Sequence, residues 1–128
     1  TWIYAGMGGA LRAPVPDFRT LTALSLAQAL AMTDLPQSLA PHLLESYRHL
    51  AAFSEVPSAL AELKRGGARL AILSNADPDM LDDLVGHAGL DDVFEHVLSV
   101  RGTGTYKPAP AVYRLATDAF DCAAGAIT

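Results

Sequence analysis

The sequence contains a single cysteine, Cys122, among its 128 residues. One thiol cannot form a disulfide within the chain, and so few cysteines are typical of a reducing compartment. The four histidines, His42, His49, His87 and His96, form no His-x-x-x-His pair and have no cysteine pair beside them. They therefore lack the spacing of metal ligands. We expect a cytoplasmic protein that has no metal site.

Basic residues and long apolar runs are also scarce. Nine lysines and arginines against fourteen acidic residues give a net charge of -5. The basic residues are scattered, which argues against a nucleic-acid partner. The longest uncharged stretch near the start, residues 20–33, is shorter than the roughly 20 apolar residues that cross a bilayer. No basic segment precedes an apolar one, as it does in a secretory signal. We expect neither nucleic acid nor a membrane as a partner.

The composition nevertheless supports a folded domain. Hydrophobic residues make up 51% of the chain and charged residues 18%, a balance that allows a buried core. The chain starts with Thr1, and its last residues, 125–128, have the pattern of a strand that has only begun. We therefore expect that both ends are internal positions of a longer protein.

The first half of the chain predicts helices only. Asp17 is suited to cap a helix over residues 18–32, whose apolar residues recur at helical spacing. A second helical face follows, formed by Leu39, Leu43, Tyr47 and Leu50. Pro57 is placed to begin a short helix that ends at the glycines 66–67.

The second half alternates strands with helices. The apolar runs 68–74 and 94–100 predict two buried strands, and Ala126-Ile127 predicts the start of a third. Helices over about 80–88 and 112–120 separate them. This β-α-β-α-β order predicts a doubly wound parallel sheet, whose chemistry lies at the carboxyl ends of the strands.

Four polar residues fall near these strand ends. Ser74 and Asn75 close the first strand, where a hydroxyl, an amide and backbone N–H groups suit an anion. An ordinary turn, with Asp77 capping the next helix, explains them as well. Lys107, in the loop after the second strand, can balance a carboxylate, or it can be a solvated loop residue. Tyr113 can reach the same edge, or it can be a half-buried helix residue.

Three groups of residues, taken in order, resemble the L-2-haloacid dehalogenases of the haloacid dehalogenase superfamily. They are Phe53-Ser54-Glu55-Val56-Pro57 leading to Leu70-Ala71-Ile72-Leu73-Ser74-Asn75, then His87-Ala88-Gly89-Leu90 with Leu98-Ser99-Val100, and last Tyr106-Lys107-Pro108 with Tyr113. The Ser-Asn and Lys-Pro motifs are shared with phosphatases of the superfamily. The longer segments 53–57 and 99–108 point more narrowly to the dehalogenases.

The resemblance implies an α/β fold: a partial doubly wound, Rossmann-like parallel sheet with a helical cap segment. Residues 1–56 would form part of the cap and residues 57–128 part of the Rossmann-like core. The family uses an aspartate that attacks the carbon bearing the halogen and forms an ester, which water then hydrolyses. The substrate would be a small 2-haloalkanoic acid and the product a 2-hydroxy acid of inverted configuration. No cofactor or magnesium is implied.

The resemblance also implies a role for each candidate residue. Ser74 and Asn75 would hold the substrate carboxylate. Lys107 would orient the nucleophile and balance its charge, and Tyr113 would support this arrangement by hydrogen bonding. Phe18 would correspond to an aromatic residue of the apolar halide pocket. Because the family is often dimeric, a homodimer is implied for the intact protein.

The sequence departs from the family's pattern at several points. It contains no Asp-x-Tyr-Gly-Thr motif, which carries the nucleophile, and we expect that motif upstream of Thr1. Ala76 replaces the usual glycine after Ser-Asn, and residues 101–105 differ from the usual loop. We therefore expect these 128 residues alone to be inactive and poorly stable, because the sheet would lack its central strand. A magnesium-dependent phosphatase and a non-catalytic binding remnant remain the alternatives.

Overall fold

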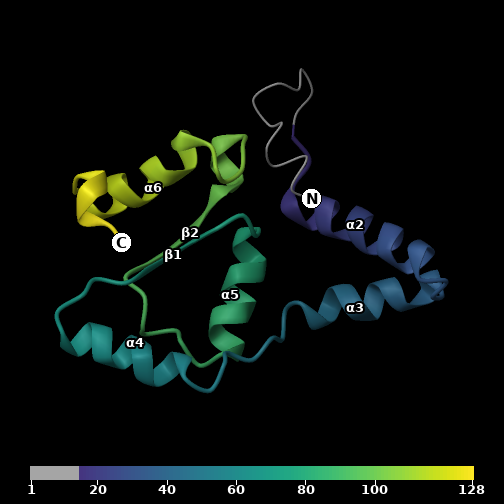
Figure 1. The fold of residues 1–128 in the computed structure, drawn as a ribbon, viewed down its shortest axis with the longest axis horizontal. Coiled ribbons are helices and arrows are strands. Elements are labelled where there is room, and N and C mark those ends of the chain that lie inside the picture. Colours follow the sequence, from purple (N-terminus) through teal and green to yellow (C-terminus); the bar gives the residue numbers. More distant parts are fainter. Residues whose placement is uncertain (1–14) are drawn as a thin grey trace.

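The computed structural model describes residues 15–128 as a mixed α/β fold with a small parallel sheet. In chain order the elements are α2 (Phe18–Met32), η1 (Gln37–Leu39), α3 (Ala40–Ser46), α4 (Val56–Arg65), β1 (Ala71–Ser74), α5 (Pro78–His87), β2 (His96–Ser99), η2 (Val100–Thr103), α6 (Pro110–Phe120) and η3 (Ala124–Ala126). Figure 1 shows α2 and α3 at one end of the molecule and the sheet with α4 and α6 towards the other.

The helix predicted over residues 18–32 is confirmed as α2. The carboxylate of Asp17 accepts a hydrogen bond of 2.7 Å from the backbone N–H of Thr20, so the predicted cap is also present. Such a bond satisfies one of the N–H groups that a helix start leaves without a partner. The position where α2 begins is therefore fixed by a local signal.

The prediction that residues 39–50 form one helical face is wrong beyond Ser46. There α3 ends, and the N–H groups of Arg48 and His49 donate to carbonyls only three residues back. These are the tighter bonds of a helix end, after which the regular spacing is lost. Tyr47 and Leu50 consequently lie outside the helix.

The parallel pairing predicted for the second half is confirmed. Ala71 of β1 lies opposite His96 of β2, and Ser74 lies opposite Ser99. Figure 1 shows α6 on one side of the two strands and α5 on the other, which is the doubly wound arrangement. Both strands end at the same edge of the sheet, so the loops that follow them meet there.

The third strand is not formed. Residues 124–126 adopt the short helix η3, and the sheet within residues 15–128 consists of β1 and β2 alone. A strand needs a neighbouring strand to pair its backbone groups. Ile127 has an extended backbone but no such neighbour among the described residues.

A buried cluster joins α2 to the second half. Leu21 of α2 packs with Val100, Tyr106 and Val112, of which Val112 is fully buried. Phe18 is packed against the same cluster. The first turn of α2 is thereby held at the carboxyl edge of the sheet.

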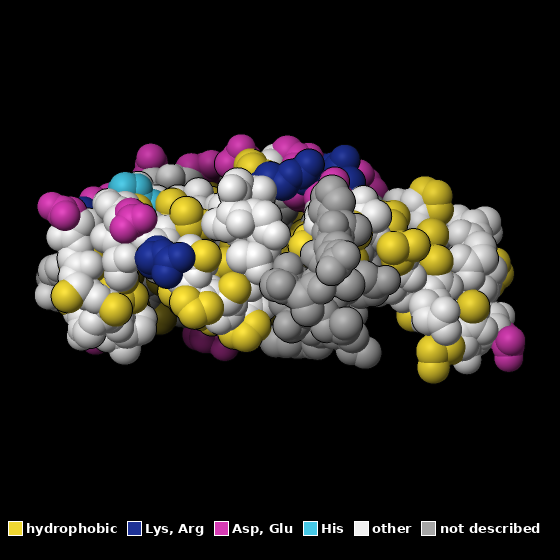
Figure 2. All heavy atoms as spheres, turned by 90° about the horizontal axis from the view of Figure 1, so that it is seen from above, with side chains coloured by type: hydrophobic (Ala, Val, Ile, Leu, Met, Phe, Trp, Pro, Cys, Tyr) yellow, Lys and Arg dark blue, Asp and Glu magenta, His cyan; other side chains and the backbone are white. Residues whose placement is uncertain are grey.

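Four large apolar side chains of α2 and the segment after it are open to solvent. Leu24, Met32, Leu35 and Leu39 are each between 39% and 75% exposed. Figure 2 shows apolar side chains gathered at the end of the molecule that α2 and α3 form. Among residues 15–128, none of the helices combines the length and the apolar composition needed to cross a bilayer.

Candidate active site

The turn that follows β1 is fixed by two serine hydroxyls. Ser74 accepts a hydrogen bond of 3.1 Å from the backbone N–H of Ala76. Ser99, at the end of β2, donates a bond of 2.7 Å to the carbonyl of the same residue. The turn that carries Asn75 is therefore attached to both strand ends.

Lys107 is held against this turn at two points. Its backbone N–H donates to Oδ1 of Asn75 at 3.0 Å, and its ammonium group donates to the carbonyl oxygen of Leu73 at 2.9 Å. The structure thus brings Lys107, from the loop after β2, to Asn75 and the end of β1. Lys107 is anchored at the strand ends and is not a freely solvated loop residue.

A cavity of about 250 Å³ opens beside this turn. Its lining comes from the start of α2, the turn after β1 and the loop after β2: Val15, Asp17, Phe18, Asn75, Asp77, Val100, Arg101, Gly104, Thr105 and Tyr106. The ring of Phe18 meets that of Tyr106 edge to face, with 6.0 Å between the ring centroids. Two residues predicted to bind substrate, Phe18 and Asn75, therefore line one cavity.

Ser74, Lys107 and Tyr113 do not line the cavity. Ser74 and Lys107 are bonded to residues beside it, as described above. Tyr113 lies on α6 and is 49% exposed, and its hydroxyl has no hydrogen-bond partner among residues 15–128. No hydrogen bond within residues 15–128 joins Tyr113 to the other predicted site residues, so its role stays a prediction.

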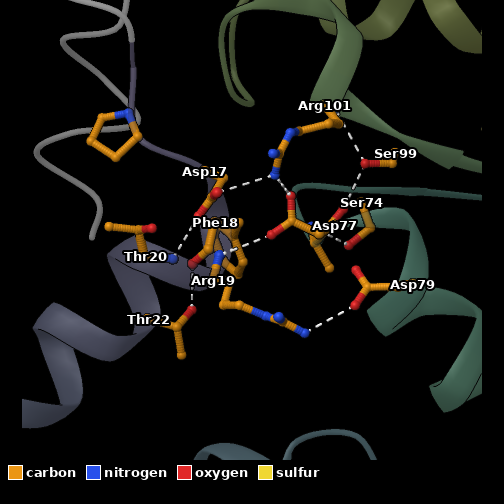
Figure 3. Close-up of polar contacts among 12 residues, drawn as sticks. Asp17, Phe18, Arg19, Thr20, Thr22, Ser74, Asp77, Asp79, Ser99 and Arg101 are labelled. Carbon is orange, nitrogen blue, oxygen red and sulfur yellow. Dashed lines mark hydrogen bonds and ion pairs between the residues drawn. The ribbon is translucent and has the colours of Figure 1, made fainter.

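The cavity also contains a charge cluster that the sequence did not reveal. The guanidinium of Arg101 bonds to the carboxylate of Asp77 and lies 3.3 Å from that of Asp17 (Figure 3). The hydrogen bond and charge of Asp77 raise the pKa of Arg101 above its usual value. Hydrogen bonds from Thr20 and the charge of Arg101 lower the pKa of Asp17. The wall of the cavity therefore carries one cation between two carboxylates.

Asp77 differs from its simplest interpretation as a helix cap. It occupies the residue before α5, yet its carboxylate forms no bond to that helix. Instead, it accepts a bond of 3.0 Å from the backbone N–H of Arg19, at the start of α2. The contacts of Asp77 with Arg19 and Arg101 could not be predicted, because both arginines are remote from it in sequence. Its position after a strand end was the only indication of a function.

Tyr106 is a buried residue in the lining of the cavity. It is 6% exposed, and its hydroxyl donates to the carbonyl of Pro16. Burial, followed by the charge of Asp77, raises the pKa of this phenol.

Nowhere in residues 15–128 do three His, Cys, Asp or Glu side chains come close enough together to hold a metal ion.

Comparison with known proteins places this site in a family. The family model of haloacid dehalogenase-like hydrolases matches residues 18–126. An (S)-2-haloacid dehalogenase of Pseudomonas sp. (strain YL) is 51% identical over 86 residues, which is 67% of this chain and 37% of the relative. The corresponding enzyme of Xanthobacter autotrophicus is 36% identical over 117 residues, 90% of this chain and 44% of the relative. The chain thus spans less than half the length of these two relatives.

Solved structures agree with this match. A crystal structure of an L-2-haloacid dehalogenase superposes with a TM-score of 0.88 at 37% identity, covering 98% of this chain and 56% of that one. The Xanthobacter autotrophicus enzyme with chloropropionic acid covalently bound gives a TM-score of 0.79 at 35% identity, covering 95% of this chain and 48% of that one. A phosphoserine phosphatase of Thermus thermophilus is 32% identical over 99 residues, 77% of this chain and 40% of that protein. The chain belongs to the haloacid dehalogenase-like hydrolase family.

Proposed function

We propose that the full-length protein to which this chain belongs hydrolyses L-2-haloalkanoic acids to 2-hydroxy acids of inverted configuration. The observation that carries the proposal is the double anchoring of Lys107 at the strand ends, beside a cavity lined by Asn75 and Phe18. The relatives named as (S)-2-haloacid dehalogenases support the same reaction.

In the proposed reaction an aspartate oxygen attacks C2 of the substrate from the side opposite the halogen. The C–O bond forms as the C–halogen bond breaks, the halide leaves with the electron pair, and an ester remains on the protein. Water then attacks the ester, which releases the 2-hydroxy acid and restores the carboxylate. We propose that the aspartate lies outside residues 1–128, since they contain no Asp-x-Tyr-Gly-Thr motif.

The polar residues of this chain would position two negatively charged groups, the attacking carboxylate and the carboxylate of the substrate. The ammonium group of Lys107 would balance and orient the attacking carboxylate. Ser74 and Asn75 would hold the substrate carboxylate. Oδ1 of Asn75 is already bonded to Lys107, which leaves the amide N–H groups of Asn75 to donate to the substrate.

The remaining candidates would act at the edges of the site. Phe18 would supply an apolar wall beside the halide, where the exclusion of water leaves the attacking carboxylate less solvated and more reactive. Tyr113 would support Lys107 through a hydrogen bond that forms in the full-length protein. We also propose that residues 1–56 belong to a cap and residues 57–128 to the core that it covers.

The test is halide release from L-2-chloropropionate by the full-length protein and by Lys107→Ala. We expect the variant to lose activity by about 10²–10³-fold, the size of effect that one aligned charge has at a reacting centre. The chain offers a matched control, because its other lysine, Lys64, lies on α4 and bonds to the carbonyl of Asp92. Lys64→Ala should retain the wild-type rate. Equal rates for the wild type and Lys107→Ala would refute the assignment.

A second candidate function is magnesium-dependent phosphate ester hydrolysis. The similarity to the phosphoserine phosphatase supports it, because the Ser-Asn and Lys-Pro motifs also suit an anionic phosphate. The two functions separate in one assay. Phosphate release from phosphoserine that requires added magnesium, with no halide release, would favour the phosphatase.

We further propose that the full-length protein is cytoplasmic and forms a homodimer. Leu39, Tyr47 and Leu50 are between 39% and 51% exposed and provide an apolar surface for a second subunit. Light scattering of the full-length protein tests the oligomeric state: twice the monomer mass would support the dimer, and the monomer mass at micromolar concentration would contradict it.

A further inference from the structure

The most deeply buried carboxylate near the cavity belongs to Asp77, which is 5% exposed. One of its oxygens accepts the backbone N–H of Arg19 at 3.0 Å, and the other accepts the guanidinium of Arg101. Figure 3 shows these donors approaching from α2 and from the loop after β2. Asp77 therefore joins three segments that are distant in sequence.

These bonds flank the residue that forms the apolar wall. Phe18 lies between Asp17 and Arg19 in the chain. The amide of Arg19 is bonded to Asp77, and the carboxylate of Asp17 is 3.3 Å from the guanidinium that Asp77 holds. Both neighbours of Phe18 are thus linked, directly or through Arg101, to one buried carboxylate.

The other end of the link is the turn that carries Asn75. Asp77 follows Asn75 by two residues, and the residue between them, Ala76, is itself bonded to Ser74 and Ser99. Asn75 is consequently linked to Phe18 through Asp77 and the hydrogen bond to Arg19. This short linkage limits how far apart Asn75 and Phe18 can lie. A carboxylate at a helix start normally bonds to its own helix, whereas this one bonds to Arg19 and Arg101 on other segments.

Replacement of Asp77 by a neutral or shorter side chain should weaken or remove these bonds. Loss of the carboxylate leaves the part-buried N–H of Arg19 without this acceptor and the guanidinium of Arg101 without its nearer partner. The half-exposed contact of the Arg19 side chain with Asp79, at 2.9 Å, is on the surface and cannot replace a buried bond.

We propose that Asp77 is a positioning residue that holds the Phe18 wall at a fixed distance from the Asn75 turn, and so sets the size of the 2-alkyl group that the pocket accepts. The proposal rests on the dehalogenase function proposed above. It assigns to Asp77, with Arg101 as its partner, the selection among 2-haloalkanoic acids of different chain length.

The test compares Asp77→Ala and Asp77→Asn with the wild type, all as full-length proteins. The substrates are L-2-chloropropionate and its longer homologue L-2-chlorobutyrate. Asp77→Ala should raise KM for L-2-chloropropionate about tenfold while kcat changes less than about threefold, because ground-state positioning is lost and the reacting groups remain. The preference between the two acids should shift by at least about fivefold.

Two comparisons separate positioning from general stability. Asp77→Asn keeps an oxygen for the N–H of Arg19 but not the charge for Arg101, so its KM should lie between those of the wild type and Asp77→Ala. Asp82→Asn is the matched control, because Asp82 is exposed on the same helix and forms no polar contact within the described part of the chain. A lowered Tm with unchanged KM and unchanged substrate preference would overturn the proposal.

A readout without substrate keeps this proposal separate from the proposed function. Hydrogen–deuterium exchange at residues 18–22 should be faster in Asp77→Ala than in the wild type, because the amide of Arg19 loses its acceptor. Unchanged exchange there would overturn the positioning role. If the wild type released no halide but this exchange increased, the proposed reaction would fail while the Asp77 link to α2 held.

Discussion

The backbone N–H of Lys107 donates to Oδ1 of Asn75 at 3.0 Å, which joins the loop after β2 to the end of β1. The ammonium group of the same lysine reaches back to the carbonyl of Leu73 at 2.9 Å. Because Lys107 is bonded through both its backbone N–H and its ammonium group, its side chain loses little conformational entropy when a reaction begins. In the proposed reaction this relationship would make the strand edge a prepared site for negative charge.

Substitution of Asn75 should separate the structural bond from substrate binding. Asn75→Asp keeps an oxygen for the N–H of Lys107 but removes the amide donors, so we expect near wild-type stability and halide release at least about 100-fold slower. Asn75→Ala should lose the same activity and also about 1–3 kcal/mol of unfolding free energy. Urea unfolding and chloride release of the full-length proteins check this. Equal stability of Asn75→Ala and Asn75→Asp would contradict the role of the bond.

The packing of α2 on the core should be visible in stability. Leu21 is 2% exposed and packs with Val100 and Val112, whereas Leu24 on the same helix is 58% exposed. Leu21→Ala should cost about 2–5 kcal/mol of unfolding free energy through lost burial and a new cavity. Leu24→Ala should change it by less than about 0.5 kcal/mol. Similar losses for the two variants in urea unfolding would show that α2 is not docked as described.

The cap of α2 should give a pH-dependent contribution. The hydrogen bonds from Thr20 and the charge of Arg101 lower the pKa of Asp17 below its reference value of 3.8. A group whose pKa is lowered by folding stabilises the fold above its unfolded pKa, and this contribution is lost as the pH falls through the folded pKa. Asp17→Ala should therefore cost about 0.5–2 kcal/mol near pH 7 and progressively less below about pH 4. A difference from wild type that stays constant from pH 7 to pH 2.5 would exclude this linkage.

The loop that lines the cavity should depend on one glycine. Gly104 has φ of +66°, in the left-handed region, although open space surrounds the place where a Cβ would stand. Gly104→Ala should cost about 1–2 kcal/mol from backbone strain alone. Gly102 also has open space but no positive φ, so Gly102→Ala serves as the control and should be nearly neutral. Thermal unfolding compares them, and equal Tm values for the two variants would refute the strain.

Local signals were sufficient for much of the fold. The start of α2 was predictable because Asp17 supplies its own cap, and β1 was predictable from its continuous apolar run. The predicted full burial of β1 is not seen within residues 15–128, where its four residues are only partly buried. The proximity of Asn75 and Lys107 was also predictable, because parallel strands end at one edge of the sheet.

The features that sequence did not predict depend on distant partners. Residues 125–128 have the pattern of a strand that begins, but no strand within residues 15–128 lies beside them, and residues 124–126 adopt η3. Asp77 has the position of a helix cap, but its carboxylate bonds to Arg19 and Arg101 and not to α5. These donors are too remote in sequence for a local pattern to predict them. Tyr113 has suitable spacing from Lys107, yet its side of α6 is half-exposed.

The most direct test of the proposed dehalogenation is to incubate the full-length protein with L-2-chloropropionate in the presence of a divalent-metal chelator. The measurement follows chloride release and the configuration of the 2-hydroxy acid formed. We expect equal amounts of chloride and of the hydroxy acid of inverted configuration, at a rate that the chelator does not change. No chloride release, together with phosphate release from phosphoserine that appears only with magnesium, would contradict it.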